Sequence, residues 1–131
     1  MSAPLAAGQR IGPLQLHLTP SLVARYLSAV GDASGVYHEL SLAPPTALAA
    51  FALRALLEQT GLPPGTMHLA QELASYRSVA LGEVLSCEGM ATQRRQRRDG
   101  DFLALEFTLA DAQGNPVMEG KSTLLTPGQG A

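Results

Sequence analysis

Ala47-Leu48-Ala49-Ala50-Phe51-Ala52-Leu53 is the stretch from which the fold can be worked out. It lies inside a predicted helix that runs from about Pro45 to Gln59, and it carries no charged or strongly polar side chain. Proline at the first helical position favours the start of this helix, and Gly61 followed by Pro63-Pro64 favours its end. A helix that is apolar on every side has to be covered on every side. The stretch therefore predicts one buried helix around which the remainder of the chain folds.

The chain after this helix has the pattern of β-strands. Segments of mostly apolar residues are separated by turn-forming pairs, which include Asp99-Gly100 and Gly114-Asn115. Large apolar residues occupy every second position from Leu103 to Leu109, which is typical of a strand with one buried face. The predicted strands are Met67–Val79, Glu83–Arg97, Phe102–Ala110 and Pro116–Thr126.

A weaker strand and another helix come before the buried helix. Ile11–Leu18 alternates weakly, and Thr19-Pro20 then supplies an N-cap residue followed by proline at the first helical position. This helix ends at Gly31, and a turn-rich loop is expected over residues 32–39. The element order predicts an α+β protein with the hotdog fold, a curved antiparallel β-sheet wrapped around a central buried helix. A single copy leaves an edge of that sheet unprotected, so a dimer is expected.

Composition limits the classes of function. The chain has 131 residues, and we expect a single domain over 1–131 with loosely ordered ends at about 1–8 and 127–131. A formal net charge of −2 gives no general attraction to nucleic acid or to an anionic membrane. The first residues lack the pattern of a signal peptide, no stretch is apolar enough to cross a bilayer, and Cys87 has no partner for an internal disulfide. These features predict a cytoplasmic protein.

Four stretches in the same order as in a known family carry a resemblance. They are Tyr26–Asp32 with its loop, Ala43-Pro44-Pro45-Thr46, residues 67–72 with 76–83, and Asp111–Val117. This set resembles the MaoC-like hotdog hydratases and dehydratases, and it is most similar to the N-terminal-half type of MaoC-like dehydratase domain. The resemblance implies reversible hydration of trans-2-enoyl-CoA or enoyl-acyl-carrier-protein to the (R)-3-hydroxyacyl thioester. It implies an acyl thioester as substrate and no cofactor.

The catalytic loop of this family runs Asp-x-Asn-Pro-x-His, and this chain departs from it. Asp32 keeps the aspartate, Tyr37 takes the place of the histidine, and His38 follows one position later. Since the family uses the aspartate and histidine as an acid/base pair, the resemblance makes Asp32, Tyr37 and His38 the candidate catalytic residues. A tyrosine is poorly suited to taking a proton at neutral pH, because an ordinary phenol ionises at about pH 10. In an extended loop His38 points away from its neighbour, and the alternative for Asp32 is a turn aspartate bonded to nearby backbone.

Further candidates would hold the thioester. In the family, backbone N–H groups at the start of the buried helix polarise the thioester carbonyl, which here assigns Pro45, Thr46 and Ala47. His68 and Gln71 match polar positions that are common in this family type. They face opposite sides of a regular strand, so both reach the site only if the strand is bulged. The alternative for His68 is a histidine satisfied within the sheet.

The main charge cluster is Arg94-Arg95-Gln96-Arg97-Arg98. Arg94 and Arg95 are candidate ligands for the phosphates of coenzyme A or for the acidic face of an acyl carrier protein. The alternative is an exposed hairpin end with solvated arginines.

Three functions are consistent with these features. The favoured one is an (R)-specific enoyl-thioester hydratase, or a dehydratase in the reverse direction. The second is a non-catalytic acyl-binding hotdog subunit that pairs with an active partner, which the presence of Tyr37 supports. A hotdog thioesterase is the weakest, because such enzymes commonly place a carboxylate on the central helix and this helix has none before Glu58. The expected protein partner is another hotdog subunit, identical or different, and no metal ion is expected.

Overall fold

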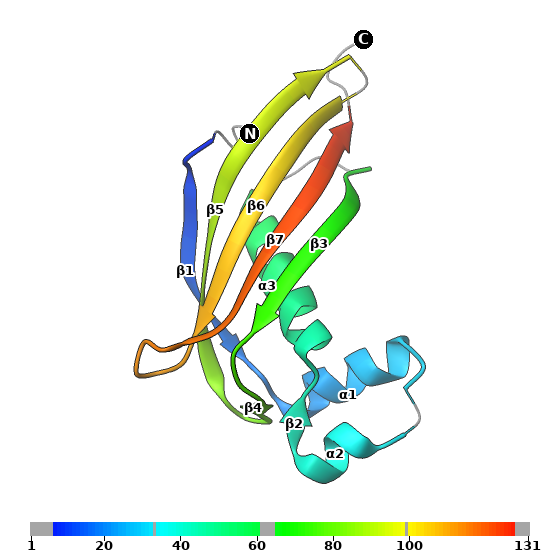
Figure 1. The fold of residues 1–131 in the computed structure, drawn as a ribbon. Coiled ribbons are helices and arrows are strands. Elements are labelled where there is room, and N and C mark those ends of the chain that lie inside the picture. Colours follow the sequence, from blue (N-terminus) through cyan, green and yellow to red (C-terminus); the bar gives the residue numbers. More distant parts are fainter. Residues whose placement is uncertain (1–6, 33, 61–64, 99, 128–131) are drawn as a thin grey trace.

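A computed structural model describes residues 7–32, 34–60, 65–98 and 100–127. Figure 1 shows its helices and strands in their order along the chain. The helices are α1 (Pro20–Ala29), α2 (Val36–Leu40) and α3 (Pro45–Thr60). The strands are β1 (Arg10–His17), β2 (Leu42–Ala43), β3 (Met67–Ser75), β4 (Val79–Ala80), β5 (Val84–Arg97), β6 (Gly100–Ala110) and β7 (Pro116–Pro127).

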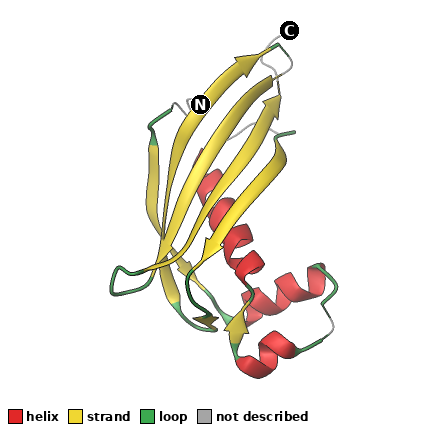
Figure 2. Ribbon diagram, viewed as in Figure 1, coloured by secondary structure: helices red, strands yellow, loops and turns green. Residues whose placement is uncertain are grey.

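The larger sheet has five strands in the order β1-β5-β6-β7-β3, and its neighbouring strands pair antiparallel. β2 and β4 form a separate two-stranded pair. Figure 2 shows α3 lying along one face of the curved larger sheet, with α1 and α2 gathered near the start of α3. The predicted α+β arrangement, a curved antiparallel sheet around a central helix, is therefore confirmed.

Loosely ordered ends were expected at residues 1–8 and 127–131. The Gly8 N–H donates to the Ala91 carbonyl at 2.6 Å, and Pro127 is the last residue of β7. Residues 1–6 and 128–131 lie outside the described part of the chain.

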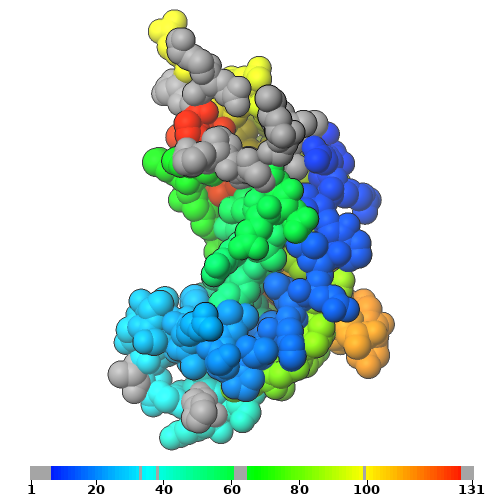
Figure 3. Space-filling view, turned by 180° about the vertical axis from the view of Figure 1, so that it is seen from behind, coloured from blue at the N-terminus to red at the C-terminus, as the bar shows by residue number. Residues whose placement is uncertain are grey.

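α3 is buried on one side only. Its apolar side lies in the core, whereas Ala50, Arg54 and Glu58 are exposed. The expectation that this helix is covered on every side is therefore wrong, because the sheet reaches around only part of it. Figure 3 shows the surface of α3 between β1 and α1. The buried residues of α3 are Ala47, Leu48, Ala49, Ala52, Leu53, Leu56 and Thr60.

α1 begins and ends as its sequence predicts. The Thr19 Oγ1 atom accepts a hydrogen bond from the Leu22 N–H at 3.2 Å, and Pro20 is the first helical residue. At the other end Gly31 has a φ of 76°, its N–H donates to Ser28, and the Asp32 N–H donates to Leu27. These two bonds satisfy carbonyls that the end of a helix leaves without partners.

The segment after α1 differs from the predicted loop. Residues Val36–Leu40 form the short helix α2, and the Ser34 Oγ atom accepts a hydrogen bond from the Val36 N–H at 3.4 Å. The assumption that Tyr37 and His38 lie in extended backbone is therefore wrong, since both are helical. The turn-forming residues Asp32 to Gly35 concealed this helix because it is only five residues long.

α3 lies against the sheet over a row of two glycines and a phenylalanine. Gly89 on β5 and Gly120 on β7 are the cross-strand partners of Phe107 on β6. A β-carbon at Gly120 would collide with the Phe107 ring, and one at Gly89 would lie 2.9 Å from a methyl group of Leu56 on α3. The absence of side chains on both sides of the ring gives the helix room to reach the sheet.

Cys87 on β5 is a packing residue. The side chain is completely buried, and this burial raises the pKa of its thiol to about 12. A thiol with such a pKa stays protonated at neutral pH and is chemically inert.

We predict that Gly120→Ala lowers the free energy of unfolding by about 1–3 kcal/mol, because the added methyl group overpacks the Phe107 ring. Urea denaturation measures the loss. The double variant Gly120→Ala with Phe107→Leu should lose less than the sum of the two single losses, since the smaller side chain relieves the collision. Additive losses would contradict this explanation.

Candidate functional site

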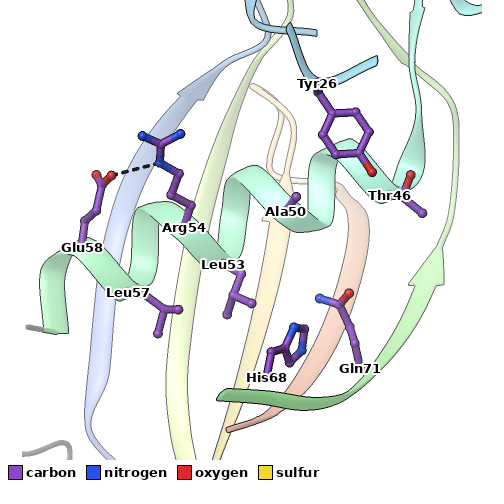
Figure 4. Close-up of a pocket in the computed structure, with 9 residues that line it drawn as sticks. All are labelled: Tyr26, Thr46, Ala50, Leu53, Arg54, Leu57, Glu58, His68 and Gln71. Carbon is purple, nitrogen blue, oxygen red and sulfur yellow. Dashed lines mark hydrogen bonds and ion pairs between the residues drawn. The ribbon is translucent and has the colours of Figure 1, made fainter. Parts of the chain in front are cut away.

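A groove of about 620 Å³ runs between α3 and the edge strand β3. Its α3 wall consists of residues that repeat every three or four positions and so share one face of the helix. In Figure 4, Tyr26 and Thr46 lie at one end of the groove and Leu57 and Glu58 at the other. The lining residues are Tyr26, Thr46, Ala50, Leu53, Arg54, Leu57, Glu58, His68 and Gln71. This face combines an apolar floor with a polar group at each end.

Tyr26 closes the groove from α1. Its ring packs edge-on against Phe51, with the ring centroids 5.8 Å apart, so that α1 is held against the outer side of α3. At the opposite end, Arg54 and Glu58 form an exposed ion pair at 3.2 Å. Such a pair adds little to stability.

His68 and Gln71 both line the groove because β3 contains a bulge. The register with β7 shifts between His68 and Ala70, so His68 pairs with Leu124 and Gln71 with Ser122. This extra residue brings the two side chains to the same face, which regular alternation would not do. The Gln71 Nε2 atom donates to the buried Ser122 Oγ atom at 3.4 Å. The sequence offers no sign of this bulge.

Among the candidate donors at the start of α3, only Thr46 has an N–H without a bond inside the described structure. Pro45 has no N–H. The N–H groups of Ala47 and Leu48 both donate to the Pro44 carbonyl, at 3.0 and 3.2 Å. No described residue accepts a hydrogen bond from the Thr46 N–H, and Thr46 lies at the end of the groove. An oxygen atom of a ligand in the groove can therefore bind there.

Tyr37 lies in a different cavity, of about 280 Å³, on the other side of the first turn of α3. Pro45 lines this cavity, whereas its neighbour Thr46 lines the groove. Ser75 and Tyr76, where β3 ends, complete part of the wall. The two cavities are thus separated by one turn of helix.

Ion pairs brace the region next to this second cavity. Arg77 donates to Glu83 at 2.6 Å and to Asp111 at 3.4 Å. It is the main cause of the lowered pKa of Glu83, whereas the pKa of Asp111 is lowered chiefly by the Asn115 N–H and further by Gln113 and Arg77. The Tyr76 hydroxyl donates to Glu119 at 2.9 Å. The sequence motif around Tyr76 and Arg77 had suggested the family but no site, and these contacts show a structural role for both.

Asp32 is half-buried in the turn before α2 and lines neither the groove nor the second cavity. Its Oδ1 atom accepts hydrogen bonds from the Ser34 N–H at 2.9 Å and from the Ser34 hydroxyl at 2.7 Å. These bonds hold the pKa of Asp32 below its usual value, because they stabilise the charged carboxylate. This geometry is that of the turn aspartate considered above. The His38 side chain lies outside the described part of the structure.

The arginine cluster lies at the end of the molecule opposite α1 and α2 (Figure 1). Arg94 is bonded to Asp101 at 2.6 Å, and the guanidinium group of Arg97 lies 4.8 Å from the centre of the Phe102 ring. Arg95 is exposed. Within one chain, Arg94 and Arg95 are therefore not brought together with Thr46 or Tyr37.

The described residues contain no group of three or more His, Cys, Asp or Glu side chains placed to share a metal ion. None of the helices in the described ranges is long and apolar enough to cross a membrane.

One family model matches most of the chain. The family model for the FAS1-like dehydratase domain region matches residues 6–120. No curated protein sequence matches the chain significantly.

Solved structures with a similar fold include two (R)-hydratases. PhaJ1 from Pseudomonas aeruginosa has a TM-score of 0.75 and 20% identity, and the match covers 95% of this chain and 84% of that chain. The enzyme from A. caviae involved in PHA biosynthesis has a TM-score of 0.74 and 19% identity, and the match covers 94% of this chain and 98% of that chain. The HadBC 3R-hydroxyacyl-ACP dehydratase complex of Mycobacterium tuberculosis has a TM-score of 0.75 and 17% identity, and the match covers 95% of this chain and 99% of that chain. At these identities the likeness is one of fold, the hotdog arrangement.

We predict that Ser34→Ala raises the pKa of Asp32 towards its usual value, because the variant removes the hydroxyl donor that is the main cause of the shift. Titration of the Asp32 carboxyl carbon by NMR measures this change. Ser34→Thr keeps a hydroxyl group and serves as the control. An unchanged Asp32 pKa in Ser34→Ala would disprove the assigned cause.

Proposed function

We propose that this chain, which belongs to the family of FAS1-like dehydratase domains, catalyses reversible hydration of a trans-2-enoyl thioester to the (R)-3-hydroxyacyl thioester. The observation that carries the proposal is the groove along α3 that ends at the unbonded N–H of Thr46. An apolar channel with one fixed donor at its end suits an acyl chain whose carbonyl group has to be held and polarised.

Each part of the groove has a role in this reaction. The acyl chain lies along Ala50, Leu53 and Leu57, and the thioester oxygen accepts from the Thr46 N–H. Negative charge develops on that oxygen in the transition state, so the donor stabilises it there. The groove runs from Thr46 to Glu58, which is twelve residues further along the helix, a rise of about 18 Å. Because only water and protons are exchanged, the reaction uses no cofactor.

Asp32 is the proposed acid/base residue, with Tyr37 or His38 as the second group in the family's loop. The Asp32 carboxylate is charged at neutral pH, which is the form that accepts a proton from water, and the Ser34 hydrogen bonds that lower its pKa make it a weaker base than an ordinary aspartate. The carrier is coenzyme A or an acyl carrier protein. Arg95, exposed on β5, is available to either, while Arg94 is also bonded to Asp101.

The second candidate function is a non-catalytic subunit that holds an acyl thioester for an active partner. The observation that favours it is the position of Asp32, which is bonded to Ser34 in an exposed turn and lines neither cavity. Thioesterase activity has less support. Glu58 is the one carboxylate that α3 places in the groove, at its far end and paired with Arg54.

The proposed assembly is a homodimer, or a heterodimer with another hotdog subunit, joined through β3. Solved relatives of this fold include the HadBC and ChsH1–ChsH2 complexes of Mycobacterium tuberculosis. β3 is one of the two edge strands of the larger sheet, and every one of its nine residues is exposed in the single chain. An unprotected edge of this length is available for pairing with another strand.

We predict that the chain alone sediments as a dimer at micromolar concentration and that Leu69→Lys shifts it towards monomer. A charge on β3 would be buried without a partner at the interface. Leu40→Lys, at another exposed leucine that lies on α2, should leave the dimer intact. A stable wild-type monomer would exclude the homodimer, and a dimer formed only with a different hotdog subunit would establish the heterodimer.

We predict that the wild-type protein hydrates crotonyl-CoA and that Asp32→Asn lowers the rate by about a hundredfold to ten-thousandfold while thioester binding is retained. Ala50→Phe should instead abolish binding, because its ring fills the groove. Among His38→Ala and Tyr37→Phe, the variant with the larger loss identifies the second group in the loop. A protein that binds acyl thioesters but never hydrates them, alone or with a partner, is the non-catalytic subunit.

A further inference from the structure

We propose that each active site is built from two copies of this chain and that His68 of one copy transfers a proton at the site of the other. The proposal rests on the hydratase function and the β3 dimer described above. It identifies a proton-transfer residue that lies outside the catalytic loop, in which Tyr37 stands where the family has histidine.

The edge strand β3 is unprotected in the single chain. β3 has one charged residue, Glu72, and no proline, so it lacks the features that usually protect an exposed edge. Met67, Leu69 and Leu73 are 53%, 44% and 39% exposed. A second copy related by a twofold axis covers this edge with an identical antiparallel strand.

Antiparallel pairing of two β3 strands sets the positions of their ends. The start of β3 in one copy lies beside the end of β3 in the other. His68 is the second residue of the strand and Ser75 is the last. Ser75 lines the cavity that contains Tyr37 and Pro45. The twofold axis therefore brings His68 of one copy to the end of the other copy where its α3 begins.

His68 and Ser75 also share a face of the sheet. Through β7, His68 aligns with Leu103 of β6, and Ser75 aligns with Leu109. Residues six positions apart on one strand point the same way, and both leucines are buried under α3. The His68 side chain therefore lies on the face where the other copy has the first turn of α3. The bulge in β3 makes this possible without turning Gln71 away from its groove.

His68 is free for this role in its own chain. It lines the groove beside Leu53 and Leu57, and no described residue forms a hydrogen bond with its ring. An imidazole group both donates and accepts protons near neutral pH, which a phenol does not.

The proton balance of hydration is complete with two groups. The water oxygen forms a bond to C3 of the enoyl chain, and the proton that it loses passes to the Asp32 carboxylate. The electron pair of the C2=C3 double bond forms a new C2–H bond with a proton from the His68 imidazolium. Solvent then takes the proton from Asp32 and restores the one on His68. Dehydration follows the same steps in reverse.

Mixed dimers test the assignment. Ala50→Phe and His68→Ala chains carrying different affinity tags are combined, and the dimer that holds one of each is isolated and assayed with crotonyl-CoA. Each variant homodimer should be at least about a hundredfold less active than wild type. In the mixed dimer, one site has both defects and the other has an open groove and an intact His68 from the opposite chain. This mixed dimer should recover about half of the wild-type activity. A mixed dimer of one Asp32→Asn chain and one His68→Ala chain should behave in the same way.

Three outcomes would overturn the proposal. They are a His68→Ala homodimer with wild-type activity, mixed dimers as inactive as their parents, and an active wild-type monomer. His68→Gln, which stays polar at this exposed position, shows whether any loss reflects chemistry or the stability of the strand.

A crosslinking measurement tests the geometry without activity. Tyr37→Cys chains and His68→Cys chains are mixed and treated with a short reagent that joins two thiols, and buried Cys87 serves as an unreactive internal control. Crosslinks between the two tagged chains are expected. Their absence, together with crosslinking inside a chain that carries both cysteines, would overturn the shared site. Substituted chains that form the crosslink, together with a wild-type protein that shows no hydration, would instead refute the hydratase function.

Discussion

The structure depends on how closely the apolar side of α3 can approach the sheet. Phe107 fills the space under the helix, and its cross-strand partners Gly89 and Gly120 have no side chains that would keep the helix away from the sheet. This contact fixes the orientation of α3 and leaves its stripe at Ala50, Arg54 and Glu58 outside the core. The groove exists because the sheet covers one side of the helix and stops at β3. The position of the Thr46 N–H at the end of that groove follows from the same contact.

The groove and the Tyr37 cavity meet at the first turn of α3, and proline has a simple chemical effect there. Pro45 has no N–H group to donate, and the Pro44 carbonyl accepts hydrogen bonds from the N–H groups of Ala47 and Leu48, which follow Thr46. A helix start normally offers several free N–H groups, whereas here it offers one. The resulting site can hold a single oxygen atom in a defined position, which suits the carbonyl oxygen of a thioester better than a phosphate group with several oxygens.

Features that depend on neighbouring residues in the chain could be predicted from the sequence. The N-cap at Thr19, the glycine that ends α1 and the strands around Phe107 follow from local rules, and the structure confirms them. The exposed side of α3 escaped prediction because alanine has no polar group that distinguishes an exposed position from a buried one. α2 was missed because turn-forming residues precede a helix of five residues. The neighbours of Tyr37 and His68 depend on contacts between distant segments, so the candidate site could be named by residue type but not assembled.

The bulge in β3 has a consequence for how this protein changes over evolutionary time. On a regular strand, a side chain leaves a binding surface only when the residue itself is replaced. Here one additional residue between His68 and Ala70 decides which face of the sheet Met67 occupies and which face His68 occupies. Loss of that residue would rotate the start of the strand by half a turn. Met67 would then point to the inner face, and the His68 imidazole would point away from it. A single codon deletion would therefore exchange the side chain offered to a neighbouring chain while leaving every other residue of the sheet unaltered.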